Sequence, residues 1–194
     1  MLEALHTIAT IAHLVGVAIG VGAATVSDVL FFRFLRDYRI SKHEERVLAM
    51  LHPLFWIALG ILVLSGVVLY LADPARLGAS PKFQLKLVVV AVIILNGVFL
   101  NAVVSPRLRR ISFGASHPSH HPGELHHLRH AAFASGAISI TSWYGALILG
   151  SLRSIPVSFA RGLLAYAVVL AGAVAASQIM EWHIRRKERQ SRVS

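Results

Sequence analysis

Five long apolar stretches constrain this sequence more than any other feature. The hydrocarbon core of a bilayer is about 30 Å thick, and an α-helix needs about 20 apolar residues to cross it. Stretches of at least that length occur at residues 4–32, 47–72, 83–105, 128–150 and 157–182. The sequence therefore predicts an all-α integral membrane bundle of about five transmembrane helices.

The composition agrees with a membrane protein. Hydrophobic residues make up 56% of the chain and charged residues 14%, whereas soluble domains carry about 25% charged residues. Such a chain has more apolar surface than one globular core could bury. We expect a single transmembrane domain over residues 1–194. The sequence has no cysteine, which excludes disulfides, iron–sulfur clusters and thiolate metal sites.

The basic residues predict an orientation. Fourteen of the 19 Lys and Arg residues lie between the first two helices, around the third connector or in the carboxyl-terminal tail. The positive-inside rule then places the amino terminus outside and the carboxyl terminus in the cytoplasm. We attribute the excess of basic residues to membrane topology and to contacts with lipid headgroups, so we expect the bilayer as a partner and no nucleic acid.

The first stretch begins with Glu3 and His6 and has no basic leader, so we expect a membrane helix and no cleaved signal peptide.

Ionisable side chains inside transmembrane helices are costly and are candidates for function. By predicted depth, three of them lie near the outer leaflet: His6, His13 and Lys86. His6 and His13 are seven residues apart, so they share a helix face but stand about 10 Å apart along the axis. They therefore cannot bind the same iron. Each of them could instead face a partner on another helix.

Two further features lie near these groups. Trp143 and Tyr144 are predicted at a similar height on the fourth helix and could line the edge of an outer site. The first helix also carries three glycines, Gly16, Gly20 and Gly22. Small residues at this spacing let another helix, or a flat macrocycle, approach the backbone closely. Both interpretations stay open at this point.

A second candidate pair lies near the inner leaflet. His52 and His130 belong to helices that run in opposite directions, yet they reach a similar depth. Two neutral imidazoles on facing helices fill both axial positions of a haem iron that transfers electrons. The alternative is a pair of interfacial histidines bonded to headgroups or backbone. His52 is the better candidate of the two, because it lies inside the apolar run, whereas His130 sits close to a helix end.

The connector at about residues 106–127 is rich in histidine. Five of its histidines are candidate ligands of a surface metal: His117, His120, His121, His126 and His127. Short histidine-rich tracts bind zinc, copper or nickel. His126 and His130 would bind one ion together if the fourth helix began before them, because they are four residues apart. Weak binding without a native role is the alternative.

The opening run Glu3-Ala4-Leu5-His6-Thr7-Ile8-Ala9 resembles the start of the HemJ-type protoporphyrinogen oxidases and of the related CopD-like membrane proteins. The likeness continues with a basic first loop, with Pro53 and with Lys86 in Lys82-Phe83-Gln84-Leu85-Lys86-Leu87, and covers about residues 3–105. In the HemJ family a histidine of the first helix and a lysine of the third are tied to haem or porphyrin binding. The resemblance implies that role for His6 and Lys86.

These observations favour a cytochrome b-like protein of the bacterial cytoplasmic (inner) membrane. It would bind haem b between its helices and transfer electrons across or within the membrane. We expect His6 and His13 as outer ligands, Lys86 at a propionate or as an unusual ligand, and His52 with His130 at a second haem. A quinone or a redox protein would be the natural partner.

Other functions stay open. Oxidation of protoporphyrinogen IX would make the chain an oxidoreductase and would depend on His6 and Lys86. Transport of copper or another divalent metal would depend on the histidine-rich connector. A structural membrane subunit would need no cofactor. The sequence leaves the oligomeric state open.

Overall fold

The computed structural model describes residues 2–37, 42–104 and 122–191, which are almost entirely helical. The elements are α1 (Leu2–Asp37), α2 (Lys42–Ala72), the short α3 (Pro74–Gly78), α4 (Pro81–Phe99), a π-helical turn η1 (Leu100–Val104), α6 (Pro122–Ser151) and α7 (Phe159–Ser191).

The predicted all-helical class is confirmed, and so is the number of candidate membrane helices. Five of the six α-helices are long and apolar enough to cross a bilayer, with spans of 22 to 28 residues. The spans are Glu3–Leu30, Met50–Ala72, Pro81–Val103, His130–Ser151 and Phe159–Ile184. They fall close to the stretches expected from hydropathy.

One helix begins earlier than expected. α6 starts at Pro122, inside the segment predicted as a connector. Proline suits the first turn of a helix, because its φ angle is already helical and its missing N–H has no partner there anyway. Residues 105–121, which make up most of the predicted connector, lie outside the described residues.

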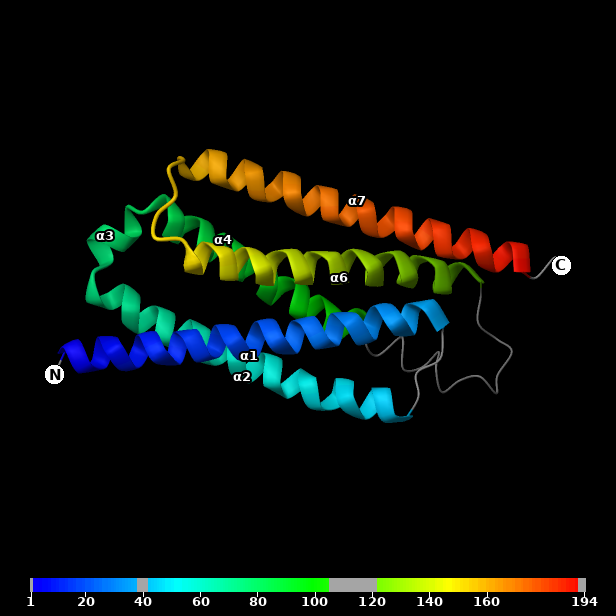
Figure 1. Ribbon diagram of the computed structural model, residues 1–194, viewed down its shortest axis with the longest axis horizontal. Coiled ribbons are helices and arrows are strands. Elements are labelled where there is room, and N and C mark those ends of the chain that lie inside the picture. The colour runs from blue at the N-terminus through cyan, green and yellow to red at the C-terminus, as the bar shows by residue number, and fades with distance from the viewer. Residues whose placement is uncertain (1, 38–41, 105–121, 192–194) are drawn as a thin grey trace.

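The helices lie side by side along the long axis of the molecule (Figure 1). α1 packs along α2, α6 contacts α1, α4 and α7, and α7 rests on α6 and α4. α3 and the amino terminus lie at one end, which we call the α3 end. α1 and α7 finish at the other end, where α2 and α6 begin. We call this the opposite end.

The core forms where α1, α2, α4 and α6 meet. It consists of Ala24, Leu59, Val89, Ile93 and Trp143. Within the candidate spans, 44% of the α6 window is buried but only 6% of the α7 window. α6 is therefore the central helix of the bundle and α7 a peripheral one.

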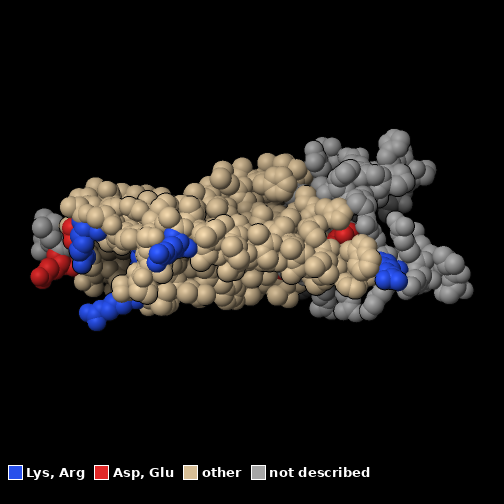
Figure 2. Space-filling model, turned by 90° about the horizontal axis from the view of Figure 1, so that it is seen from above, with Lys and Arg blue, Asp and Glu red and all other residues tan. Residues whose placement is uncertain are grey.

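Charged side chains avoid the middle of the molecule. On the face shown in Figure 2, Lys, Arg, Asp and Glu lie toward the two ends, and uncharged side chains cover the length between them. This distribution is what a bilayer requires, because a charged side chain at its centre costs several kcal/mol.

Glycines on α1 allow close packing. Gly16 faces α2, where an added Cβ would lie 3.1 Å from Leu62 Cγ and 3.2 Å from the Ala58 carbonyl oxygen. At Gly20 an added Cβ would overlap the indole ring of Trp143. Of the two interpretations of these glycines, helix packing therefore holds at both positions.

We predict that Gly20→Ala destabilises the protein by about 1–3 kcal/mol, because the new methyl group must displace a buried indole. Thermal unfolding of the detergent-purified protein measures the loss. Gly22→Ala is the matched control, since no described atom lies within 4 Å of a Cβ at Gly22. Equal unfolding temperatures for the two variants would contradict the packing described for Trp143.

Candidate functional site

The strongest candidate site begins at His13, which is half-buried on α1. Its Nδ1 lies 3.0 Å from Ser65 Oγ on α2. The Ser65 hydroxyl donates its proton to the Ile61 carbonyl at 2.5 Å. A hydroxyl has one proton to give, so Ser65 accepts a hydrogen bond from His13. The proton of His13 is therefore on Nδ1, and the lone pair is on Nε2.

The sequence of α2 makes room for this imidazole. Ser65 bonds back to its own helix at Ile61, which holds the hydroxyl against the backbone. Gly66 follows, and a Cβ there would lie 3.7 Å from His13 Cε1. Small residues at these two positions leave room for the ring beside α2. The expectation that His13 faces a partner on another helix is confirmed.

Lys86 on α4 joins this group. It is half-buried and close enough to His13 and Lys82 to interact electrostatically with both. Lys82 donates from Nζ to the Leu152 carbonyl at the end of α6. No carboxylate whose side chain the structure describes forms an ion pair with Lys86. A cation in a membrane span without a carboxylate partner is suited to binding an anionic group.

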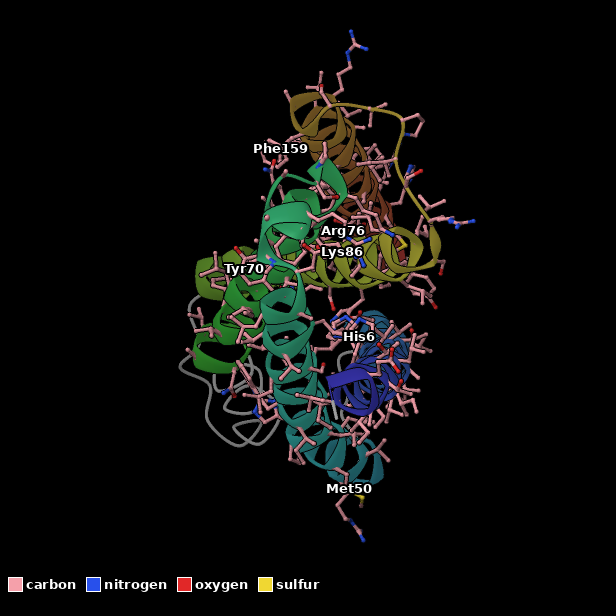
Figure 3. The ribbon with its side chains drawn as sticks, turned by 90° about the vertical axis from the view of Figure 1, so that its left-hand side faces the viewer. His6, Met50, Tyr70, Arg76, Lys86 and Phe159 are labelled. Carbon is pink, nitrogen blue, oxygen red and sulfur yellow. The ribbon has the colours of Figure 1, made fainter. Side chains whose placement is uncertain are left out.

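His6 lies apart from this cluster. It is exposed in the first turns of α1, about 10 Å along the helix axis from His13. Figure 3 looks onto the α3 end and shows His6 on α1 and Lys86 on α4 at that end. The structure therefore places His13 against Ser65, with Lys86 within electrostatic range of His13 and His6 nearer the end of the bundle.

Trp143 and Tyr144 of α6 each contact another helix. Trp143 is 2% exposed and packs edge-on against Phe55, with ring centroids 5.5 Å apart. The Tyr144 hydroxyl lies 3.2 Å from Thr25 Oγ1. Gly20 beside Trp143 and Thr25 beside Tyr144 are about 10 and 18 Å further along α1 than His13. Both aromatic residues therefore take part in helix packing at mid-height.

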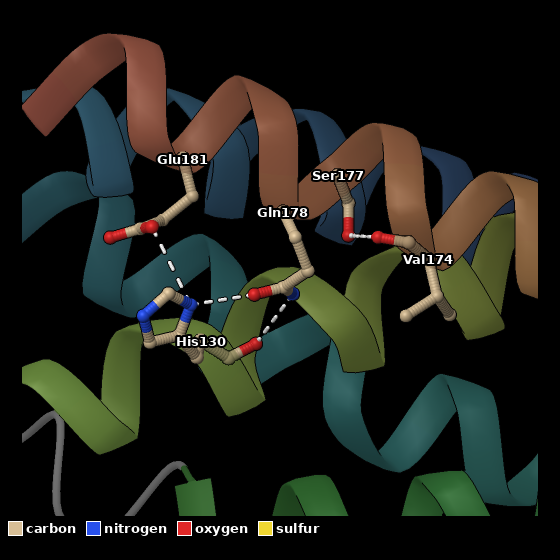
Figure 4. Close-up of polar contacts among 5 residues, drawn as sticks. All are labelled: His130, Val174, Ser177, Gln178 and Glu181. Carbon is tan, nitrogen blue, oxygen red and sulfur yellow. Dashed lines mark hydrogen bonds and ion pairs between the residues drawn. The ribbon is translucent and has the colours of Figure 1, made fainter.

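At the opposite end, His130 contacts α7 (Figure 4). Its Nδ1 lies 2.6 Å from Gln178 Oε1 and 3.4 Å from Glu181 Oε2. Gln178 Nε2 donates to the His130 carbonyl at 3.1 Å, which fixes Oε1 as the acceptor from Nδ1. Glu181 is fully buried. The described hydrogen bond of His130 Nδ1 goes to Gln178, and an imidazole fixed through one ring nitrogen is oriented as metal-binding histidines often are.

His52 and His130 are not in contact in the described structure. His52 is exposed on α2, and its ring meets Trp56 edge-on with centroids 6.3 Å apart. α2 packs on α1, whereas His130 faces α7. The second haem site predicted between these two histidines stays a prediction.

Sequence reasoning missed Gln178 and Glu181. Glu181 lies in the last turn of a predicted membrane helix. A carboxylate at such a position usually reaches water, so the sequence does not mark it as a candidate for function. The available signal was the spacing: Gln178 and Glu181 are three residues apart and so share one helix face.

Buried serines of α6 each bond to a different helix. Ser135 Oγ donates to Asn96 Oδ1 of α4 at 2.7 Å, and Asn96 Nδ2 returns a bond to the Ser135 carbonyl at 3.0 Å. Ser139 bonds to the carboxyl group of Asp28 on α1. Ser142 Oγ lies 2.8 Å from the hydroxyl of Tyr166 on α7. Neighbouring helices are thus joined to α6 by polar contacts inside the bundle.

The histidine-rich connector is only partly described. His117, His120 and His121 lie outside the described residues, as do the side chains of His126 and His127. The backbone of α6 does place His126 and His130 one turn apart on one helix. Among the residues that the structure describes, no group of three His, Cys, Asp or Glu could hold a metal ion.

No protein-family model matches this sequence, and comparison with curated proteins and with solved structures finds no similar protein. The likeness of residues 3–105 to the HemJ-type and CopD-like families therefore stays a prediction from short motifs.

We predict that Gln178→Ala weakens the attachment of α7 to α6. It removes both hydrogen bonds to His130, and one interhelical hydrogen bond in a membrane contributes about 0.6 kcal/mol on average. The expected loss is therefore about 1 kcal/mol, measured by unfolding in mixed detergent micelles. Ser151→Ala is the control, because the hydrogen bond described for Ser151 goes to Leu147 of its own helix. Equal stability of the Gln178→Ala and Ser151→Ala variants would contradict the role of Gln178 in attaching α7 to α6.

Proposed function

We propose that this chain is a cytochrome b-like membrane protein that binds haem b, with His13 as an iron ligand and Lys86 as the counter-charge of a propionate. The observation that carries the proposal is the arrangement of His13. Its Nδ1 is hydrogen-bonded to Ser65, and its Nε2 has the lone pair that an iron ion requires. Metal-binding histidines almost always hold their second ring nitrogen in this way.

The charge at the site supports the same proposal. A haem carries two propionates, and their burial in a membrane needs basic partners. Lys86 is half-buried beside His13 and forms no described ion pair. Haem b, when bound, would supply one-electron chemistry. The chain itself holds the imidazole in one tautomer and places a cation beside it.

The packing limits where such a group could lie. The space beside Gly16 is occupied by α2 and the space beside Gly20 by Trp143. The proposed site therefore does not use these glycines of α1. His6 is about 10 Å further along α1 and takes no part in binding the same iron. The second axial ligand is not assigned.

The same residues support one alternative function. Lys86 would equally bind a carboxylate of protoporphyrinogen IX, as the HemJ-like motifs imply. Absorbance separates the two functions, because an oxidase would release porphyrin, whereas a cytochrome would retain haem with a reversible reduced spectrum.

We further propose that the protein spans a bacterial cytoplasmic membrane with its amino terminus outside. The excess of Lys and Arg at the predicted inner side supports this orientation. A quinone or a redox protein would then supply or remove the electrons.

Haem binding is tested with the protein purified in detergent. We expect a sharp reduced α-band and about one haem b per chain by pyridine haemochrome assay. His13→Ala should abolish the band. Ser65→Ala should weaken haem affinity about 10- to 100-fold, as loss of an outer-shell partner usually does. A colourless protein that cannot be reconstituted with haem would rule out the proposal.

His183→Ala is the matched control for this series. His183 is exposed on α7, and its ring meets the neighbouring Trp182, so its loss should leave the spectrum unchanged. If His183→Ala removed the band and His13→Ala did not, the iron would lie at the opposite end of the bundle.

The orientation is tested by labelling single cysteines, which is simple because the chain has none. Ser154→Cys, in the exposed connector between α6 and α7, should react with a membrane-impermeant maleimide added to whole cells. Ser191→Cys, at the end of α7, should react only after lysis. The reverse pattern would show that the positive-inside assignment is wrong for this chain.

A further inference from the structure

Asp28 is a buried carboxyl group on the part of α1 that faces α6. It is 5% exposed, and its Oδ2 has no hydrogen-bond partner among the described residues. The Ser139 hydroxyl supplies the hydrogen bond described for this group. Asp28 lies inside the first membrane span, which ends at Leu30. Water and lipid headgroups are therefore excluded from it by the protein itself.

The helices around Asp28 do not supply a counter-ion in the described structure. On α6 the facing groups are Ser139 and, one turn away, Ser135, both uncharged. His130 is nine residues before Ser139, about 14 Å along the helix, and is bonded to α7. On α2, which runs antiparallel to α1, Arg46 and His52 are nearest in register, and neither forms a described ion pair with Asp28.

In the sequence of α1, no Lys, Arg or His lies three or four residues from Asp28. Its next cation is Arg33, five residues further along. Five residues correspond to about 140° of rotation around a helix, so Arg33 starts from a different face. Side chains that meet on one helix are three or four residues apart.

An ionised carboxylate in this position would leave one buried oxygen without a donor or a cation. Burying an unpaired charge is far more costly than burying a neutral carboxylic acid, so such groups become neutral by binding a proton. We propose that Asp28 is a proton-binding site of the bundle, which holds a proton between α1 and α6 and exchanges it with the opposite end. The proposal does not depend on the proposed haem site.

Polar groups of α6 occur at several depths between the opposite end and Asp28, although they face different neighbouring helices. Moving from the opposite end, hydrogen-bonding groups occur at His130, at the Ser135–Asn96 pair and at Ser139 beside Asp28. The steps along α6 are five and four residues, or about 7 and 6 Å. Proton relays in membrane proteins use chains of Asp, Glu and His side chains, and Asp28 and His130 are the ionisable groups at the two ends of this series.

The test uses dicyclohexylcarbodiimide, a hydrophobic reagent that reacts with protonated carboxyl groups inside membranes. The full-length protein in liposomes is treated at neutral pH, and the modified residue is found by peptide mass mapping. We expect labelling at Asp28, decreasing as the pH is raised, and none at this position in Asp28→Asn. Peptide mass mapping of the wild-type protein is sufficient for the test even if the Asp28→Asn variant fails to fold.

Asp73 is the internal control. It lies outside the spans, next to α3, and forms an ion pair of 2.7 Å with Arg76. The reagent partitions into the bilayer, whereas the Asp73 carboxyl group lies at the surface and is paired with a guanidinium group. We therefore expect at least about tenfold less labelling at Asp73 than at Asp28.

Two results would overturn the proposal. Absence of labelling at Asp28 would mean that the carboxylate is ionised and paired, for instance with Arg33. Protection of Asp28 by sodium ions at constant pH would mean that the site binds a metal cation instead of a proton.

Discussion

The hydrogen bonds that α6 makes to its neighbours organise this bundle. In a bilayer, burial of apolar surface does not drive helices together, because lipid is as apolar as leucine, and association depends on close packing and polar contacts. α6 is joined to α4 by Ser135, to α1 by Ser139 and to α7 by Ser142. α7, with only 6% of its span buried, is joined to α6 by the hydrogen bonds described at Tyr166 and Gln178.

The two ends of the bundle use histidine differently. At the α3 end, His13 is fixed by a serine and lies beside a lysine, so that the local charge is positive. At the opposite end, His130 lies between an amide and a fully buried carboxylate, so that its surroundings are polar and acidic. Asp28 lies between them in height. An anionic cofactor therefore suits the first site, and a cation or proton suits the second.

The helices could be predicted from the sequence, but their neighbours could not. Long apolar runs identify membrane spans directly, because only length and hydropathy matter. The rotation of each helix about its axis could not be predicted in this way, because a helix that is apolar on most faces does not indicate which face lies inward. Hence the contact of His130 with Gln178 was missed, while its pairing with His52 was predicted from depth alone. The glycines of α1 were informative because a missing side chain limits the possible neighbours. They correctly suggested close packing but could not show that Trp143 fills Gly20.

The odd number of spans has a consequence for the protein as a whole. Five crossings would place Leu2, at the start of α1, and Ser191, at the end of α7, in different compartments. Polar groups at different depths along α6 would then lie at different fractions of the membrane voltage. Moving one elementary charge through the full thickness against 100 mV requires about 2.3 kcal/mol. Any charge that travels only between the opposite end and Asp28 would feel part of that voltage, so its equilibrium would respond to the energised state of the cell.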